Sequence, residues 1–87
     1  MQVLKVSSKS APNSVAGMIA SQIKEFHKTE IQAIGAGALN QTMKAAAIAK
    51  GFLAPLGINI VCIPSFVEIT IDGESKTGMK ITIQEEK

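Results

Sequence analysis

The spacing of hydrophobic and polar positions changes several times along this chain, and each change predicts a new element. Residues 3–6 carry apolar side chains at three of four positions, which predicts a first strand that is apolar on both faces and therefore buried. Between about residues 13 and 27, apolar side chains recur every three or four positions, which predicts an amphipathic helix. The buried stripe of this helix is formed by Val15, Ala16, Ile19, Ile23 and Phe26.

A polar loop, Ser7–Asn13, joins this strand to this helix. Ser10 or Asn13 is the expected N-cap, because a hydroxyl or amide oxygen at that place accepts from a free backbone N–H. Pro12 fits the first helical turn, where its missing N–H costs nothing.

A second strand and a second helix follow, separated by a double-glycine turn. Residues 30–34 predict the strand, Gly35 and Gly37 the turn, and residues 38–50 an alanine-rich helix. Gly51 has the position of a C-terminal glycine that ends a helix. The buried stripe is expected at Leu39, Met43, Ala46 and Ala47, with Gln41, Lys44 and Ala45 on the opposite side.

The last third of the chain reads as strands. Residues 57–63 predict a third strand, and Pro64 indicates a bulge or an edge position there. Asp72-Gly73 between two alternating runs is a strong hairpin signal, and residues 76–84 return as the fourth strand. The order β-α-β-α-β-β predicts an α+β two-layer sandwich in one domain, residues 1–87: a four-stranded mixed sheet with two helices on one face.

Composition places this domain in the cytoplasm. Of the 87 residues, 46% are hydrophobic, which supports a core without disulfides, and Cys62 is the only cysteine. Cys62 lies within an apolar strand and is expected to be a core residue. Residues 1–6 are too short and too alternating for a signal peptide, and no apolar run reaches the length of a membrane span.

The charge pattern permits a nucleic-acid partner without requiring one. Nine lysines oppose seven acidic residues, giving a net charge of +2, and there is no arginine to read guanine with two hydrogen bonds. The chain has no Trp or Tyr and only three Phe residues. A base-stacking platform for single strands would therefore require an exposed Phe.

The residues needed for catalysis are missing. His27, the only histidine, is expected to be exposed near the end of the first helix, without the partners of a catalytic triad. No ligands cluster for a metal. The glycine turn lacks the third glycine of a dinucleotide fingerprint and the Gly-Lys-Ser/Thr of a P-loop. We therefore predict no enzyme activity, no catalytic residue, no metal site and no cofactor.

The double-glycine turn itself has two open interpretations. No Ser, Thr, Asp or Asn stands where it would cap the second helix, so the first backbone N–H groups of that helix need another partner. The helix dipole makes this end attractive to an anion such as a phosphate. The alternative is an ordinary tight turn whose free N–H groups bind water.

Several segments carry a resemblance to a known family. Glu30–Gln41 and Ala45–Gly51 are similar to the stage V sporulation protein S family, as are Val3–Ser7, Pro12–Gly17 and Val61–Pro64. The match covers essentially the whole chain, and the resemblance implies a role in the sporulation of endospore-forming bacteria. More distantly, the family is similar to the Alba superfamily of small dimeric nucleic-acid-binding proteins. That similarity implies the same β-α-β-α-β-β fold, and a homodimer or tetramer formed through the second helix and adjoining strand ends.

The resemblance to Alba proteins implies three contact segments. They are the loop Ser7–Asn13 with Lys9, the glycine turn Gly35–Gln41, and a hairpin arm, Val67–Met79. Here the turn has neither Arg nor Lys, and the first cation beyond it is Lys44, so phosphate binding should be weaker. The predicted nucleic-acid-binding residues are Ser8, Lys9, Asn13, Gly35, Gly37, Asn40, Gln41, Lys44 and Lys76.

Three functional hypotheses follow. The first is a sporulation regulator that binds DNA or RNA through its phosphate backbone without reading bases. The second is a dimeric protein–protein interaction module that binds no nucleic acid, because the turn surface is uncharged and made of small residues. The third is a sensor that binds a small ligand at the uncapped helix end. None of them involves a membrane.

Overall fold

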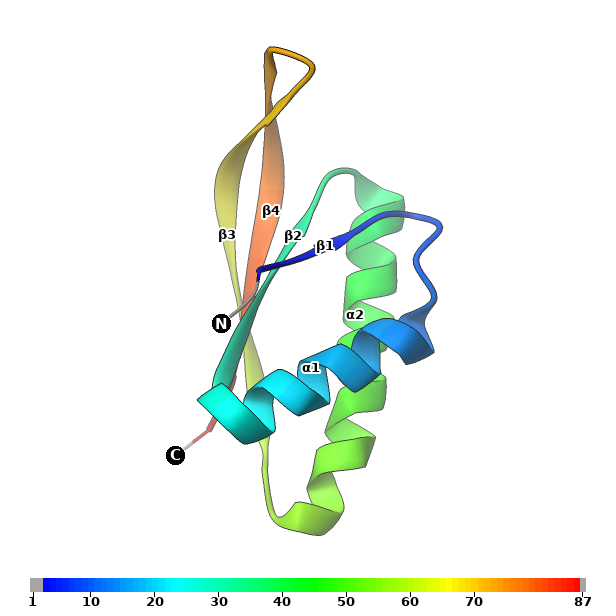
Figure 1. The fold of residues 1–87 in the computed structure, drawn as a ribbon, viewed down its shortest axis with the longest axis vertical. Helices are drawn as coiled ribbons and strands as arrows, with labels where there is room; N and C mark the ends of the chain where they lie inside the picture. The colour runs from blue at the N-terminus through cyan, green and yellow to red at the C-terminus, as the bar shows by residue number, and fades with distance from the viewer. Residues whose placement is uncertain (1–2, 87) are drawn as a thin grey trace.

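A four-stranded mixed sheet carries both helices on one face (Figure 1). The computed structural model describes residues 3–86. The strand order is β1-β2-β4-β3, with β1 parallel to β2 and the other pairs antiparallel. The elements are β1 (Val3–Val6), α1 (Pro12–Phe26), β2 (Lys28–Ala33), α2 (Ala36–Leu53), a 3-10 turn η1 (Ala54–Leu56), β3 (Ile60–Ile71) and β4 (Glu74–Glu85). The predicted fold class and element order are confirmed.

The core lies between this sheet face and the two helices. Alternate residues of β1, β2 and β4 point toward the helices, and they are buried: Leu4, Val6, Ile31, Ile81 and Ile83. The helices contribute the fully buried Ile19, Ile23 and Leu53. Two buried threonine hydroxyls have partners, because Thr29 Oγ1 donates to Gln22 Oε1 at 2.6 Å and Thr42 Oγ1 donates to Ala38 O at 2.9 Å. The core therefore buries no unpaired hydroxyl at these two positions.

The helix α1 begins without a side-chain cap. Ala11 is the N-cap residue, Pro12 is the first helical residue, and neither Ser10 nor Asn13 caps the helix as predicted. The reason is that the Ser10 hydroxyl is held within its own loop, where it accepts from Ser7 N at 2.9 Å. The helix ends as expected near His27, which adopts a left-handed φ of 68° and donates its N–H to Ile23 O.

The helix α2 is longer than predicted and buries a different stripe. Gly51 lies inside it rather than ending it, and the chain leaves η1 at Gly57 with φ 74°. Ala45 was predicted to face outward but is buried, whereas Met43 and Ala47 are exposed. The smallest side chains face the core because they let α2 approach α1 and the sheet closely; the buried set is Ala38, Thr42, Ala45, Ala46, Ala49 and Leu53.

β1 and β3 are the outer strands of the sheet, although a buried strand was predicted at residues 3–6. β1 is an edge strand, and Val3 remains 39% exposed. β3 is the other edge strand and continues through Pro64, which confirms an edge position for that proline. Cys62 was predicted to be a core residue, but it is exposed because β3 lies outside the part of the sheet that the helices cover.

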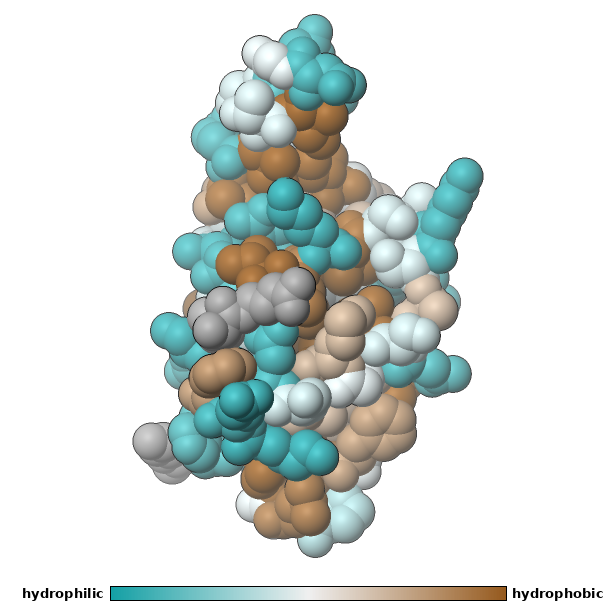
Figure 2. Space-filling view, in the orientation of Figure 1, coloured by the Kyte–Doolittle hydropathy of each residue, from teal (hydrophilic) through white to brown (hydrophobic). Residues whose placement is uncertain are grey.

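The β3–β4 hairpin projects beyond the rest of the sheet as a two-stranded arm. β2 stops pairing with β4 at Met79, whereas β3 and β4 continue to the pair Ile71–Glu74. Asp72 and Gly73 have φ values of 51° and 80°, which fit the predicted two-residue turn. Apolar surface is exposed just below the polar tip of this arm (Figure 2), where Ile71 is 40% exposed.

Candidate nucleic-acid interface

The start of α2 lies directly against the loop between β1 and α1. A Cβ atom built on Gly37 would lie 2.8 Å from Ser8 Cβ, so the two backbones approach closely because Gly37 has no side chain. One turn further along α2, Gln41 Nε2 donates to Ser10 O at 3.0 Å. These two contacts join segments that are about thirty residues apart in sequence into one surface.

The loop that meets α2 is a closed turn. Ser10 N donates to Ser7 O at 3.1 Å, and Lys9 N donates to Ser7 Oγ at 3.2 Å. The backbone of Lys9 is thereby fixed while its side chain is exposed. The turn presents one cation beside the start of α2.

The N-terminus of α2 is open, as predicted. Gly35 is the N-cap with φ 90° and ψ 161°, and no side chain caps the helix there. Only glycine adopts this backbone conformation readily. Ala36 and Gly37 are exposed. The first N–H groups of α2, which have no partner within the helix, therefore point toward an accessible surface with positive partial charge.

Two further predicted residues share the outward face of α2. Asn40 and Lys44 are four positions apart and both exposed, so they lie one above the other on that face. Gln41 is half-buried because it bonds to the loop. Within residues 3–86 the one ion pair joins His27 to Glu85, so Lys44 has no carboxylate partner there.

The structure does not bring all predicted residues together. Ser8, Lys9, the glycine turn, Asn40, Gln41 and Lys44 form one side of the molecule. Asn13 is exposed in the first turn of α1, where the loop ends. Lys76 pairs with Ile69 in the arm, and strand alternation places it on the sheet face that carries no helix. Lys76 is therefore separate from the start of α2.

Two hydroxyl groups of the arm hold the Glu68 carboxylate, an arrangement that was not predicted from the sequence. Glu68 Oε2 accepts from Ser75 Oγ at 2.7 Å, and Glu68 Oε1 accepts from Thr77 Oγ1 at 2.6 Å. These two hydrogen bonds hold the pKa of the Glu68 carboxyl below its usual range, and the bond from Thr77 has the larger effect. The two-residue turn was the available signal, because it sets Glu68 opposite Thr77. With Asp72 and Glu74 also present, the arm is acidic rather than basic.

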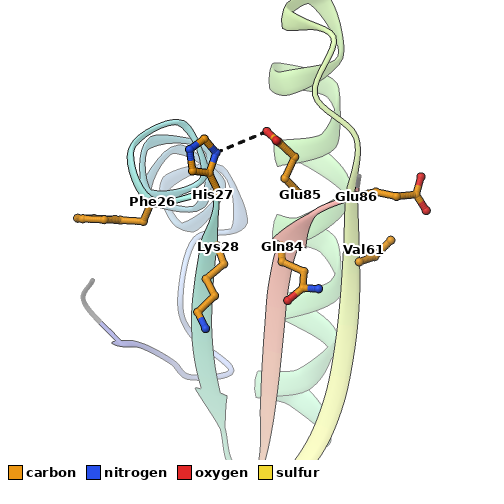
Figure 3. Close-up of a pocket in the computed structure, with 7 residues that line it drawn as sticks. All are labelled: Phe26, His27, Lys28, Val61, Gln84, Glu85 and Glu86. Carbon is orange, nitrogen blue, oxygen red and sulfur yellow. Dashed lines mark ion pairs between the residues drawn. The ribbon is translucent and has the colours of Figure 1, made fainter.

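A hollow of about 440 Å³ lies where α1, β2 and the ends of the β3–β4 ladder meet (Figure 3). His27 is turned toward Glu85, with Nδ1 and Oε1 3.9 Å apart, while Phe26 points away from them. The His27 side chain is 64% exposed, which confirms its predicted exposure. Among residues 3–86 there is no group of three or more His, Cys, Asp or Glu side chains placed to hold a metal.

Comparison with known proteins identifies the family. A model of the family described as stage V sporulation protein S (SpoVS) matches residues 2–86. The chain belongs to the SpoVS family. Membership supports a sporulation-associated role.

The SpoVS chain also has a structural neighbour. It is similar to Alba from Thermoplasma volcanium, with a TM-score of 0.61 and 14% sequence identity over 99% of this chain and 100% of that chain. This similarity establishes an Alba-like fold for the SpoVS chain. No helix within its described residues is long and apolar enough to cross a membrane.

Proposed function

We propose that this SpoVS-family protein binds DNA or RNA in a sporulation-associated regulatory role. The proposed site is the joined surface of the β1–α1 loop and the start of α2. The observation that carries the proposal is the contact of Ser8 with Gly37, because it sets a lysine-bearing loop beside an open helix N-terminus. A phosphate at this end would accept from the backbone N–H groups of the first turn.

The side chains around this end would complete the contact. Lys9 and Lys44 supply positive charge, and Asn40 supplies an amide that can donate to a phosphate oxygen. These contacts position a backbone and read no base. Ser8 and Gln41 would shape the site without contacting the phosphate. Ser8 packs against Gly37, and Gln41 donates a hydrogen bond to the loop.

Two lysines make this a weak electrostatic site with a modest salt dependence. Neutralising two phosphates gives a slope of about −1.8 for the logarithm of the binding constant against that of the salt concentration. Affinity should therefore fall about tenfold between ~50 and ~200 mM salt. An Alba-like fold with a basic turn and arm would show a steeper slope.

Titration of labelled single-stranded and duplex DNA and RNA at those two salt concentrations tests the proposal. Lys9→Glu and Lys44→Glu should each weaken binding and flatten the salt dependence. Lys24→Glu is the matched control, because Lys24 is an exposed lysine in the last turn of α1, at the far end from the loop. Absence of binding at low salt, or equal losses in all three variants, would contradict the proposal.

The alternative function is a dimeric protein–protein interaction module. The side chains Met43, Phe52 and Leu56, on α2 and the turn after it, are 39%, 52% and 58% exposed. Exposed apolar groups of this size favour an interface. We propose a homodimer or tetramer formed through α2 and the neighbouring strand ends. Light scattering should show at least a dimer for the wild type and a smaller species for Leu56→Glu. A wild-type monomer at high protein concentration would exclude the dimeric module.

A further inference from the structure

Phe66 is the most exposed large hydrophobic residue of the described chain. Its side chain is 79% exposed, and it lines a hollow of about 220 Å³ between the start of α2 and the base of the arm. Leu39 and Met79 supply the other large apolar walls. The remaining lining residues are small or short: Gly35, Ala36, Thr77 and Gly78. The hollow is thus an open apolar slot with one aromatic wall.

The slot adjoins the proposed phosphate site. Gly35 and Ala36 line it and also form the first residues at the open end of α2. Neither residue has a side chain larger than a methyl group, so neither side chain blocks the space between the aromatic ring and the helix N-terminus. A nucleotide whose phosphate binds the first turn of α2 would have its base next to Phe66.

The polar atoms at the rim favour stacking over base reading. The Thr77 hydroxyl already donates to Glu68 at 2.6 Å, so it is engaged within the arm. The side chains of the slot therefore offer apolar and aromatic surface, and the one hydroxyl donor among them, that of Thr77, is already engaged. Stacking on an aromatic ring is tolerant of sequence because every base has a π-face.

We propose that Phe66 stacks on an unpaired base of single-stranded DNA or RNA. Inside a duplex, both faces of a paired base are covered by the neighbouring bases. The Phe66 ring can therefore stack only on a base that is unpaired. The inference rests on the proposed function and narrows its partner to single strands or to unpaired segments. Binding then prefers single strands over duplex without a preference for sequence.

The other two phenylalanines do not share this setting. Phe26 and Phe52 are 44% and 52% exposed, but they lie at the C-terminal ends of α1 and α2, away from the glycine turn. Phe52 is therefore a matched control for an exposed ring outside the slot. The alternative occupant of the slot is a second copy of the chain. The experiments below distinguish this occupant from a nucleic-acid base.

The sequence provides a direct reporter of stacking. Because the chain has no Trp or Tyr, Phe66→Trp introduces its only indole. Titration of this variant with a 12-nucleotide single strand, at low salt, should quench the indole fluorescence. A strand with the same phosphates but no bases should bind, by anisotropy of a label on the strand, without quenching. Phe52→Trp should show no quenching with either strand.

Substitution by alanine gives the energetic test. Phe66→Ala should weaken single-strand binding by about 5- to 160-fold, the range for loss of one stacked base, and leave binding of the strand without bases unchanged. Binding without quenching in Phe66→Trp would overturn the stacking proposal alone. A drop in oligomeric state of Phe66→Ala by light scattering would assign the ring to a contact between copies and overturn it too. Absence of binding by every strand would overturn stacking and the proposed function together.

Discussion

Ser8 occupies the space that a side chain at Gly37 would need. A Cβ atom on Gly37 would lie 2.8 Å from Ser8 Cβ, closer than two such carbons approach in proteins. Gly35 is required for a different reason, because its φ of 90° is a left-handed conformation. The two glycines thus serve a backbone turn and a close contact between distant segments. Neither role depends on a dinucleotide.

The first prediction concerns this contact. Gly37→Ala should destabilise the protein by about 1 kcal/mol, because overpacking of roughly 1–3 kcal/mol outweighs the helix propensity of alanine. Gly51→Ala is the control, because nothing lies within 4 Å of its Cβ position inside the same helix. It should stabilise by about 0.4–1 kcal/mol. Urea unfolding measures both, and a stabilised Gly37→Ala would show that Ser8 moves away freely.

The features predicted correctly from sequence are local ones. The hairpin at Asp72-Gly73, the exposure of His27 and the uncapped start of α2 each depend on a few neighbouring residues. The order of elements follows in the same way from periodicity. Together these are enough to predict the fold class, because few arrangements bury both helices on one sheet.

The features predicted wrongly depend on the position of one element over another. Cys62 lies in an apolar strand, yet it is exposed because the two helices are too few to cover β3. Ala45 is buried because the face of α2 that carries small side chains lies against α1. The positions of the bulky residues in the sequence do not reveal this orientation. The contact of Ser8 with Gly37 was also beyond sequence reasoning, since it joins segments whose relative placement only the fold determines.

The second prediction concerns the base of the arm. A Cβ atom on Gly78 would lie 2.9 Å from Ala33 O, 2.9 Å from Ile69 Cδ1 and 3.1 Å from Ile34 Cγ1. Gly78→Ala should therefore destabilise by about 1–3 kcal/mol in thermal or urea unfolding. Adding Ile69→Val removes one of the three clashing atoms and should recover part of the loss. A double variant as unstable as the sum of its two parts would contradict the proposed clash with Ile69.

The third prediction concerns the pH dependence of the arm. Because the pKa of Glu68 is lowered in the folded protein, its contribution to stability is complete above the pKa of an unfolded glutamate. That contribution is lost as the pH falls through the lower pKa that Glu68 has in the folded protein. Carbon NMR titration of the Glu68 carboxyl should show this low value, and Ser75→Ala combined with Thr77→Val should raise it. An identical titration in wild type and double variant would show that the hydroxyls do not stabilise the carboxylate.

The fourth prediction concerns Cys62, the only thiol of the chain. Although the residue is exposed, partial burial of its thiol raises the pKa of Cys62. Since the thiolate is the reacting species, iodoacetamide should alkylate the folded protein more slowly at neutral pH than the urea-unfolded chain. The rise of the rate with pH should also occur at higher pH in the folded protein. Mass spectrometry follows the single adduct, with Cys62→Ser as the unreactive control, and equal rates in both states would show that the fold does not desolvate the thiol.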